Sequence, residues 1–366
     1  MISYQEALEV LSAHQFELTT EKVAIEDANG RVLAEDIKAD RALPPYDRVT
    51  MDGIAINHEA YAKGQRTFEI IETLGAGVPQ KSYEQKDQCV QIMTGAIMPQ
   101  GLDTVIRYED ITIANGQATV NVETVKAKQN IHFKGEDRAA GEVVLEKGIK
   151  LSPAELIVAA AVGISEIKVY RMPTAAIITT GDELVDIHEQ PEEYQVRRSS
   201  NYGILASLQS WGVTAKQFHF NDVKKLLKSK LSDLIESFDL LVLTGGVSRG
   251  KFDYLPEVLE ELGVQKHFHK VKQRPGKPFW FGTAPKNTTV FALPGNPVSS
   301  FVCAQVYLQY WLKNSLQLDA SLATVKLSEP IEFMPPLTYF LECKVSANEK
   351  GERVAQKFKG NGSGDF

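Results

Sequence analysis

Cysteine is scarce in this 366-residue sequence, and its three cysteines, Cys89, Cys303 and Cys343, lie far apart with no paired spacing. This scarcity argues against a disulfide framework and against a structural zinc site. Long apolar runs are also absent, and no window approaches the roughly 18 apolar residues of a membrane-spanning helix. The first residues carry neither a basic nor an apolar segment, so we expect no signal peptide, a cytoplasmic location and no membrane partner.

The sequence also lacks an excess of positive charge. Its formal net charge is −7, which disfavours nucleic-acid partners because they require a basic surface. Two fingerprints are missing: the G-x-G-x-x-G dinucleotide motif and the Walker phosphate loop. His267 and His269 alternate on a predicted strand, but no third metal ligand is apparent. Glycine- and proline-rich turns remain as the features that can carry function.

The chain divides into segments of different periodicity, because 366 residues exceed what one hydrophobic core supports. Ser3 and Glu6 form a capping box that predicts a helix ending near His14. Short alternating runs at 68–74, 88–93, 104–108 and 118–125 predict a β-rich part within 44–137. Pro153 predicts another helix, since proline is tolerated at a first helical position.

From Pro173 onward, strands and helices alternate, which is typical of a doubly wound α/β domain with a parallel sheet. The expected strands are 175–180, 214–220, 240–244 and 288–293, and the expected helices are 200–211, 223–237, 254–262 and 297–316. From about Leu318 the pattern returns to strands, and about 45 residues is little material for an independent core.

Two of the expected strands run into glycine turns with acidic side chains, at 245–253 and 181–183. Ligands bind outside the carboxyl ends of parallel strands, where glycines let backbone N–H groups approach an anion. A carboxylate that faces phosphates needs a cation between them, so Asp253 and Glu183 predict Mg²⁺ held partly by substrate oxygens. Each acid also has an interpretation without a metal. Asp253 would lie near a helix N-terminus, where an acid is favourable in any case, and Glu183 would belong to a solvated acidic turn.

Two further turns lie later in the chain. Five cations and no acid occupy 266–277, and Arg274 and Lys277 flank a Pro-Gly turn. A charged segment is ordinarily a solvated face, but solubility does not explain the glycine, so we favour an anion site. In the turn at 294–297, capping explains Asn296 and Pro297, whereas the glycine indicates close backbone approach to a ligand. The turns at 51–55 and 93–96 by themselves indicate only the entry to strands.

The ordered set of turns resembles one family across almost the whole chain: the MoeA and gephyrin E-domain proteins, which are molybdopterin molybdenumtransferases. The matching segments are 44–53, 93–96, 134–137, 180–184, 200–201, 244–248, 275–278 and 293–299. Each turn alone is weakly specific, but their order along one chain is highly specific.

The resemblance implies a multidomain α/β plus β protein whose doubly wound α/β domain is similar to molybdopterin adenylyltransferases. The implied parts are a helical linker domain (1–43 plus 138–172), an inserted β-rich domain (44–137), a molybdopterin-binding α/β domain (173–317) and a C-terminal β domain (318–366). The family's last domain continues past the turn that Gly362-Ser363 matches, so we expect this one to be incomplete.

Family members are homodimers that insert molybdate into adenylylated molybdopterin with Mg²⁺ and release AMP, and we expect the same here. The resemblance implies catalytic roles for Asp52, Thr94, Glu183 and Asp253, and metal binding by Asp52, Glu183 and Asp253. The implied substrate-binding residues are Ser248, Lys270, Arg274, Lys277, Pro294, Gly295, Asn296, Pro297, Asp137, Asp222 and Ser363. The cations would stabilise developing negative charge. We also expect transient contact with a molybdopterin adenylyltransferase.

Departures from the family pattern keep alternative functions open. Asn221-Asp222 replaces a pair of acids, so one acidic position is lost. His132 stands where an arginine often precedes the Gly-Glu-Asp turn, which weakens an anion contact there at high pH. The alternatives are a non-catalytic dimeric scaffold, an impaired homologue and a molybdopterin adenylyltransferase. The insertion at 44–137 argues against the last, because stand-alone adenylyltransferases lack it.

Overall fold

The computed structural model of the chain describes residues 1–246 and 254–358. The chain forms two compact units: unit 1 comprises Met1–Ala34, Gly148–Ser152 and Glu166–Phe366, and unit 2 comprises Glu35–Lys147 and Pro153–Ser165. None of the helices in the described ranges combines the length and apolarity that crossing a membrane requires. The finer division into four domains stays a prediction.

The centre of unit 1 is a six-stranded sheet with the order β16-β13-β17-β21-β20-β18. Its strands are β13 (Thr174–Thr180), β16 (Thr214–Phe220), β17 (Leu240–Thr244), β18 (Gln265–His269), β20 (Trp280–Thr283) and β21 (Thr289–Leu293). The strands β16, β13, β17 and β21 are parallel, which confirms the predicted α/β arrangement. Strand β20 runs antiparallel to both of its neighbours. The sequence pattern does not predict it, because it is short, contains a glycine and follows a proline-rich turn.

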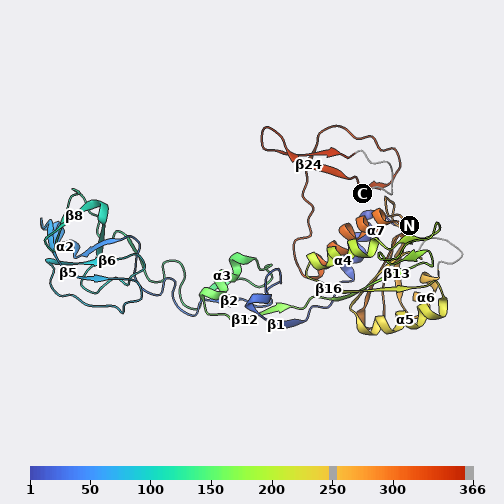
Figure 1. Cartoon of the computed structure of the whole chain (residues 1–366), viewed down its shortest axis with the longest axis horizontal. Helices are drawn as coiled ribbons and strands as arrows, with labels where there is room; N and C mark the ends of the chain where they lie inside the picture. The colour runs from blue at the N-terminus through green and yellow to red at the C-terminus, as the bar shows by residue number, and fades with distance from the viewer. Residues whose placement is uncertain (247–253, 359–366) are drawn as a thin grey trace. The chain divides into compact units, whose positions relative to one another are not determined.

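Helices cover both faces of this sheet, because its central strands are apolar on both sides (Figure 1). One face packs against α1 (Tyr4–Ala13), α4 (Ser200–Ser210) and a continuous helical segment of α7 (Pro297–Cys303), the π-helical η4 (Ala304–Leu308) and α8 (Gln309–Ser315). The other face packs against α5 (Lys224–Ser237) and α6 (Leu255–Glu261). Along β13, Ile177 belongs to the first cluster and Ile178 to the second, as alternation along a strand requires.

The predicted helix starts are confirmed at atomic detail. Ser3 N donates to Glu6 Oε2 at 2.6 Å and Glu6 N donates to Ser3 Oγ at 3.2 Å, which completes the capping box of α1. Asn296 Oδ1 accepts from Ser299 N at 3.0 Å and Pro297 is the first residue of α7, as the capping interpretation expects. The expected single helix at 297–316 is present, with the π-helical η4 in its middle.

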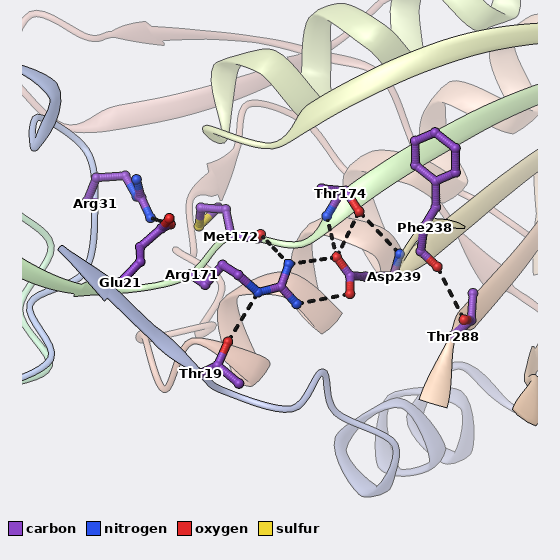
Figure 2. A network of polar contacts seen from close by, with 9 residues as sticks. All are labelled: Thr19, Glu21, Arg31, Arg171, Met172, Thr174, Phe238, Asp239 and Thr288. Carbon is purple, nitrogen blue, oxygen red and sulfur yellow. Dashed lines mark hydrogen bonds and ion pairs between the residues drawn. The ribbon is translucent and has the colours of Figure 1, made fainter. Parts of the chain in front are cut away.

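A polar network holds the amino-terminal ends of the neighbouring strands β13 and β17 (Figure 2). Arg171 donates from Nη1 and Nη2 to Asp239 Oδ2 and Oδ1, at 2.8 and 3.0 Å. The same carboxylate accepts from Thr174 N and Oγ1, at 2.7 and 2.8 Å. The Arg171 guanidinium also lies over the Phe16 ring, 4.9 Å from its centroid. Because Asp239 precedes β17 and Thr174 begins β13, the network fixes how both strands enter the sheet.

Short strands make up the rest of unit 1, and the return to strands after about Leu318 is confirmed. The pairs are β1 (Thr20–Ala24) with β12 (Glu166–Tyr170), β14 (Leu184–Val185) with β15 (Val196–Arg197), and β19 (Gln273–Arg274) with β23 (Thr338–Tyr339). A three-stranded sheet follows in the order β22-β25-β24, from β22 (Lys326–Leu327), β24 (Cys343–Ala347) and β25 (Arg353–Lys357). The 3₁₀ turns are η1 (Ile25–Asp27) and η3 (Pro285–Asn287).

Unit 2 is rich in strands, as predicted, and its main sheet has the order β7-β4-β6-β5-β9-β8. These strands are β4 (Gly53–Ile56), β5 (Thr67–Leu74), β6 (Gln88–Ile92), β7 (Thr104–Arg107), β8 (Ile111–Ala114) and β9 (Gln117–Val120). Smaller elements are β2 (Ile37–Lys38) with β11 (Val143–Leu145), β3 (Arg48–Val49) with β10 (Ile131–His132), α2 (His58–Ala62), η2 (Tyr108–Asp110) and α3 (Pro153–Ala161).

The predicted strand at 118–125 is wrong in its second half. Strand β9 ends at Val120, and its partner β8, which the prediction omits, precedes it in a hairpin. Asn115 and Gly116 connect the two strands with φ of 50° and 75°. Two residues with positive φ form the turn that closes such a hairpin, so this register is set by the turn.

Candidate active site

The carboxyl ends of β13, β17 and β21 meet at one edge of the sheet of unit 1, which we call the carboxyl edge. Gly245 has a φ of 91°, and a Cβ there would lie 2.8 Å from Thr180 O, so this position requires glycine. Gly295, which follows β21, lies against Gly245, since a Cβ added to Gly295 would be 3.6 Å from Gly245 Cα. The structure therefore brings the turns after these three strands together without side chains between them.

A buried hydroxyl lies beneath the Gly245-Gly246 turn. Thr180 is 3% exposed, and its Oγ1 has no hydrogen-bond partner among the described residues. A Cβ added to Gly246 would lie 3.1 Å from this oxygen, so the hydroxyl is directly beside the turn. Buried hydroxyls are ordinarily satisfied, and a ligand oxygen or an ordered water would do so here. Thr180 begins the matching segment 180–184, but the sequence alone indicates no role for its hydroxyl.

The acidic turn after β13 contains Asp182 and Glu183, both exposed. Asn221 Nδ2 donates to Asp182 Oδ1 at 3.0 Å, and Asp222 N donates to the same oxygen at 3.2 Å. The asparagine at the position of the lost acid therefore has a physical role, because an aspartate there could not donate to Asp182. The predicted Asp222 thus contacts the acidic turn through its backbone N–H.

His219 and Arg198 lie beside the acidic turn, and sequence reasoning missed both. His219 Nδ1 is 3.1 Å from both Thr179 O and Thr179 Oγ1. The carbonyl oxygen can only accept, so a ring with its proton on Nδ1 donates to it. Burial lowers the pKa of His219 and nearby Arg198 lowers it further, whereas Asp182 is among the groups that raise it, and the net direction is down. The His219 ring is therefore neutral near pH 7. Arg198 also forms an ion pair with Asp186.

Residues 270–277, which we call the cationic turn, fold against the helix that follows the 294–297 turn. Arg274 and Lys277 are exposed, while Gly276 is buried with a φ of 86°. A Cβ on Gly276 would lie 2.5 Å from Cys303 Sγ and 3.4 Å from Ser299 O, both in α7. Because α7 begins directly after Asn296, the structure places the cationic turn and the third glycine turn of the carboxyl edge on one local scaffold.

Lys270 belongs to the same turn and begins it. Its φ is 74°, and its N–H donates to Phe279 O at 2.8 Å. Val271 N donates to Lys277 O at 3.0 Å, so backbone bonds close the base of the turn. Lys270, Arg274 and Lys277 therefore belong to one turn, and their binding of an anion stays a prediction.

In unit 2, Asp52 and Thr94 form one pair. Thr94 donates to Asp52 Oδ1 from its Oγ1 at 2.6 Å and from its N–H at 2.7 Å. These two bonds hold the pKa of the exposed Asp52 carboxyl below its usual value, with the hydroxyl as the larger cause. The structure thus joins two predicted residues that are far apart in sequence, and it keeps the carboxylate ionised.

A second polar group of unit 2 contains the predicted Asp137. His132 Nε2 lies 3.0 Å from Asp137 Oδ1, and His132 Nδ1 lies 3.1 Å from Arg48 Nη2. An arginine can only donate and a carboxylate can only accept, so a neutral ring with its proton on Nε2 satisfies both neighbours. The histidine that departs from the family pattern is therefore a link between Arg48 and Asp137.

The remaining predicted residues Ser248, Asp253 and Ser363 lie outside the described residues. Within the described ranges, no three His, Cys, Asp or Glu side chains gather closely enough to hold a metal ion. Magnesium commonly binds only one or two protein carboxylates and takes its other ligands from water and substrate phosphates. The exposed Glu183 carboxylate beside the carboxyl edge fits one position of such a donor set.

Together, the fold and this site define a multidomain protein built around a molybdopterin-binding α/β domain. Residues 176–314 match the family model described as "Probable molybdopterin binding domain". Residues 2–163 match the model of the MoeA N-terminal region (domain I and II).

Comparison with known proteins identifies the family. A molybdopterin molybdenumtransferase from Synechocystis is 38% identical over 100% of this chain and 92% of that protein. One from Staphylococcus epidermidis is 30% identical over 96% of this chain and 86% of that protein. The crystal structure of a molybdopterin biosynthesis moeA protein from Pyrococcus horikoshii matches with a TM-score of 0.84 and 28% identity, covering 100% and 92% of the two chains. The chain belongs to the MoeA family of molybdopterin molybdenumtransferases, which confirms the predicted family.

Proposed function

We propose that this chain is a molybdopterin molybdenumtransferase that inserts molybdate into adenylylated molybdopterin, with Mg²⁺, and releases AMP. Family membership supports the place in molybdenum cofactor biosynthesis. The observation that carries the proposal is the carboxyl edge, where Gly245 and Gly295 leave the backbone open beside the scaffold of the cationic turn. Open backbone N–H groups and cations are what an anionic ligand with phosphates requires.

The residues of unit 1 divide into two proposed roles. Lys270, Arg274 and Lys277 bind the phosphate groups or molybdate, and their fixed positive charge stabilises negative charge as it develops. The turn formed by Pro294, Gly295, Asn296 and Pro297 shapes the pocket, and Asp222 and Ser248 contact substrate. Thr180 adds a hydroxyl at the same edge. No covalent enzyme intermediate is needed, because positioning and electrostatics suffice for this transfer.

Acidic residues form the other half of the proposal. Glu183, with Asp253 and Asp52, is assigned to Mg²⁺, which when bound offsets charge on the pyrophosphate and so favours AMP as a leaving group. Thr94 keeps Asp52 ionised and oriented, since its two hydrogen bonds fix one carboxylate oxygen. Asp137 and Ser363 are assigned to substrate contact. We further propose a homodimer, located in the cytoplasm, that receives its pterin from a molybdopterin adenylyltransferase.

AMP release by the purified chain tests this proposal. With adenylylated molybdopterin and Mg²⁺, AMP should appear in proportion to molybdate and saturate. Replacing both Arg274 and Lys277 by alanine should raise the KM for molybdate at least about tenfold, because two charge-assisted contacts are lost. The matched control replaces Lys344 and Lys350, two exposed lysines of the C-terminal part, by alanine and should leave KM unchanged.

Several outcomes would contradict parts of the proposal. ATP consumption without molybdate would identify an adenylyltransferase. A dimer that releases no AMP would favour the scaffold. A species of only 40.5 kDa by light scattering would refute the homodimer. An unchanged KM in the Arg274 and Lys277 variant would remove the cationic turn from the site.

A further inference from the structure

A buried glutamine lies inside the cationic turn. Gln273 is 1% exposed, although the residues on either side of it are exposed cations. Its Nε2 donates to Pro275 O at 3.0 Å and to Gly276 O at 3.1 Å. Its Oε1 accepts a hydrogen bond from the buried Tyr307 hydroxyl. One side-chain amide thus connects the tip of the turn to the hydrophobic core of unit 1.

The turn is shaped to fit this amide. A Cβ on Gly276 would lie 2.7 Å from Gln273 Nε2 and 2.5 Å from Cys303 Sγ, so any larger residue would push the tip away. Cys303 Sγ is also 3.5 Å from Gln273 Nε2 and 3.7 Å from Gly276 O. A thiol is a weak donor, so the amide is the main group that satisfies both carbonyls of the tip.

The base of the turn is held separately by backbone bonds. Ile2 pairs with Val271, and Lys272 N donates to Ile2 O at 2.7 Å. On the other side, Thr338 N donates to Lys272 O at 2.9 Å and Phe340 N donates to Arg274 O at 2.8 Å. These bonds and the bond from Val271 N to Lys277 O lie on either side of Pro275 and Gly276, whose carbonyls instead accept from Gln273. The position of the tip therefore depends on Gln273.

We propose that Gln273 is a positioning residue for anion recognition. Its amide fixes the tip of the cationic turn, and the fixed tip directs Arg274 and Lys277 outward as a preorganised pair. Preorganised cations bind an anion without first losing conformational freedom. The role of the turn as an anion site rests on the proposed function, whereas the fixing of the tip rests on the contacts alone.

Two variants test the role. Gln273→Leu keeps the approximate size of the side chain but removes both donors, so the two carbonyls lose their partner. We expect the KM for molybdate to rise about tenfold with kcat within about threefold, because positioning of a binding group is lost. The matched control is Gln305→Leu, which removes an amide that donates to Ser207 Oγ at 2.7 Å in the same unit. It should leave KM unchanged.

Gln273→Glu supplies a pH readout. A neutral carboxyl group can still donate to one carbonyl, but an ionised carboxylate would face two carbonyl oxygens and repel them. Burial raises the pKa of such a carboxyl group. We therefore expect the KM ratio of Gln273→Glu to wild type to increase with pH between about 6 and 8.5, while the ratio for Gln273→Leu stays constant.

Hydrogen–deuterium exchange separates this inference from the proposed function. Peptides covering residues 270–279 should exchange faster in Gln273→Leu than in wild type or in Gln305→Leu. If wild type releases no AMP, the proposed function fails, and exchange alone decides the positioning role. Unchanged exchange in Gln273→Leu, or an unchanged KM in an active and folded variant, would overturn it. A kcat that falls while KM stays constant would also overturn it.

Discussion

Replacing Asp239 by asparagine is the sharpest test of how β13 and β17 are held at their amino-terminal ends. Its carboxylate accepts four hydrogen bonds of 2.7–3.0 Å, two from Arg171 and two from Thr174. An asparagine keeps the shape and one acceptor oxygen, but its NH₂ group faces donors and the charge is lost. The network is far from the carboxyl edge, so the effect should be on stability.

The expected magnitude follows from the number of bonds and from their exposure. A hydrogen bond to a charged group contributes about 1.5–3 kcal/mol. The side chains of Arg171 and Asp239 remain 34% and 25% exposed, so water replaces part of what is lost. We therefore expect the free energy of unfolding of unit 1 to fall by about 2–3 kcal/mol. This corresponds to a Tm lower by about 4–12 °C for a unit of this size.

Tryptophan fluorescence is the appropriate assay. The three tryptophans, Trp211, Trp280 and Trp311, all belong to unit 1, so urea and thermal transitions report on that unit. The control is Asp233→Asn, which replaces an exposed aspartate on α5. It should change the free energy of unfolding by less than about 0.5 kcal/mol.

The pH dependence gives a second readout. Burial alone raises the pKa of Asp239, but the hydrogen bonds from Arg171 and Thr174 outweigh it and leave the pKa below the ordinary 3.8. Because the pKa is depressed by folding, the stabilisation is fully present above 3.8 and is lost as pH falls through the folded-state pKa. The difference between wild type and Asp239→Asn should therefore be constant from pH 7 to about 5 and shrink below about 4. A gap that grows towards acid pH, or a variant as stable as Asp233→Asn at pH 7, would refute the reasoning.

Three further predictions concern the acidic turns and the carboxyl edge. Thr94→Val removes the hydroxyl that chiefly lowers the pKa of Asp52, so this pKa should rise towards 3.8 in a carbon-13 carboxyl titration. Asn221→Asp replaces a donor to Asp182 by a second carboxylate, which should lower stability by about 0.5–1 kcal/mol at pH 7 and by less below about pH 4, in urea unfolding. Gly245→Ala forces a side chain into a φ of 91° against a backbone oxygen at 2.8 Å and should lower stability by at least about 2 kcal/mol.

Each of these predictions has a matched control or a contradicting result. Thr124→Val changes an exposed threonine of unit 2 and should leave the pKa of Asp52 unaltered. Equal stability losses for Asn221→Asp at pH 3 and pH 7 would show that charge is not the cause. Gly212 has a φ of 82°, but a Cβ added there would be 3.8 Å from its nearest neighbour, Met172 Cε, which is an ordinary contact. Gly212→Ala therefore measures the backbone strain without a steric clash. If it lowers stability as much as Gly245→Ala, close approach at the carboxyl edge plays no part.

The parallel core of unit 1 could be predicted because its strands are continuous apolar runs bounded by turn residues. β17 and β21, for example, are buried on both faces, and this property is visible in residues 240–244 and 289–293. Gly245 and Gly295, which follow these strands, can also be read from the local sequence, and a glycine at such a position indicates a backbone that a ligand can approach closely. Local sequence therefore contains both the strands and the turns that follow them.

Other features depend on partners that are distant in sequence. Gln273 stands among cations and resembles a surface residue, but Tyr307 and Cys303 bury it. Asn221 looks like a lost acid until Asp182 is placed beside it. A side chain whose role is set by a partner 30 or more residues away leaves no local periodicity to detect. The antiparallel β20 is missed for a different reason, because its partners β18 and β21 are close in sequence but the strand itself is short and contains a glycine.

The cationic turn has a consequence for the order of folding. Ile2 pairs with one side of the base of the turn, and β23 pairs with the other. These partners come from early and late parts of the sequence, so their contacts close very long loops and carry a large entropic cost. During synthesis, the turn cannot be complete until residues near 340 have emerged from the ribosome. We therefore expect the growing chain to form its sheet first and to acquire its arginine and lysine pair among the last ordered features.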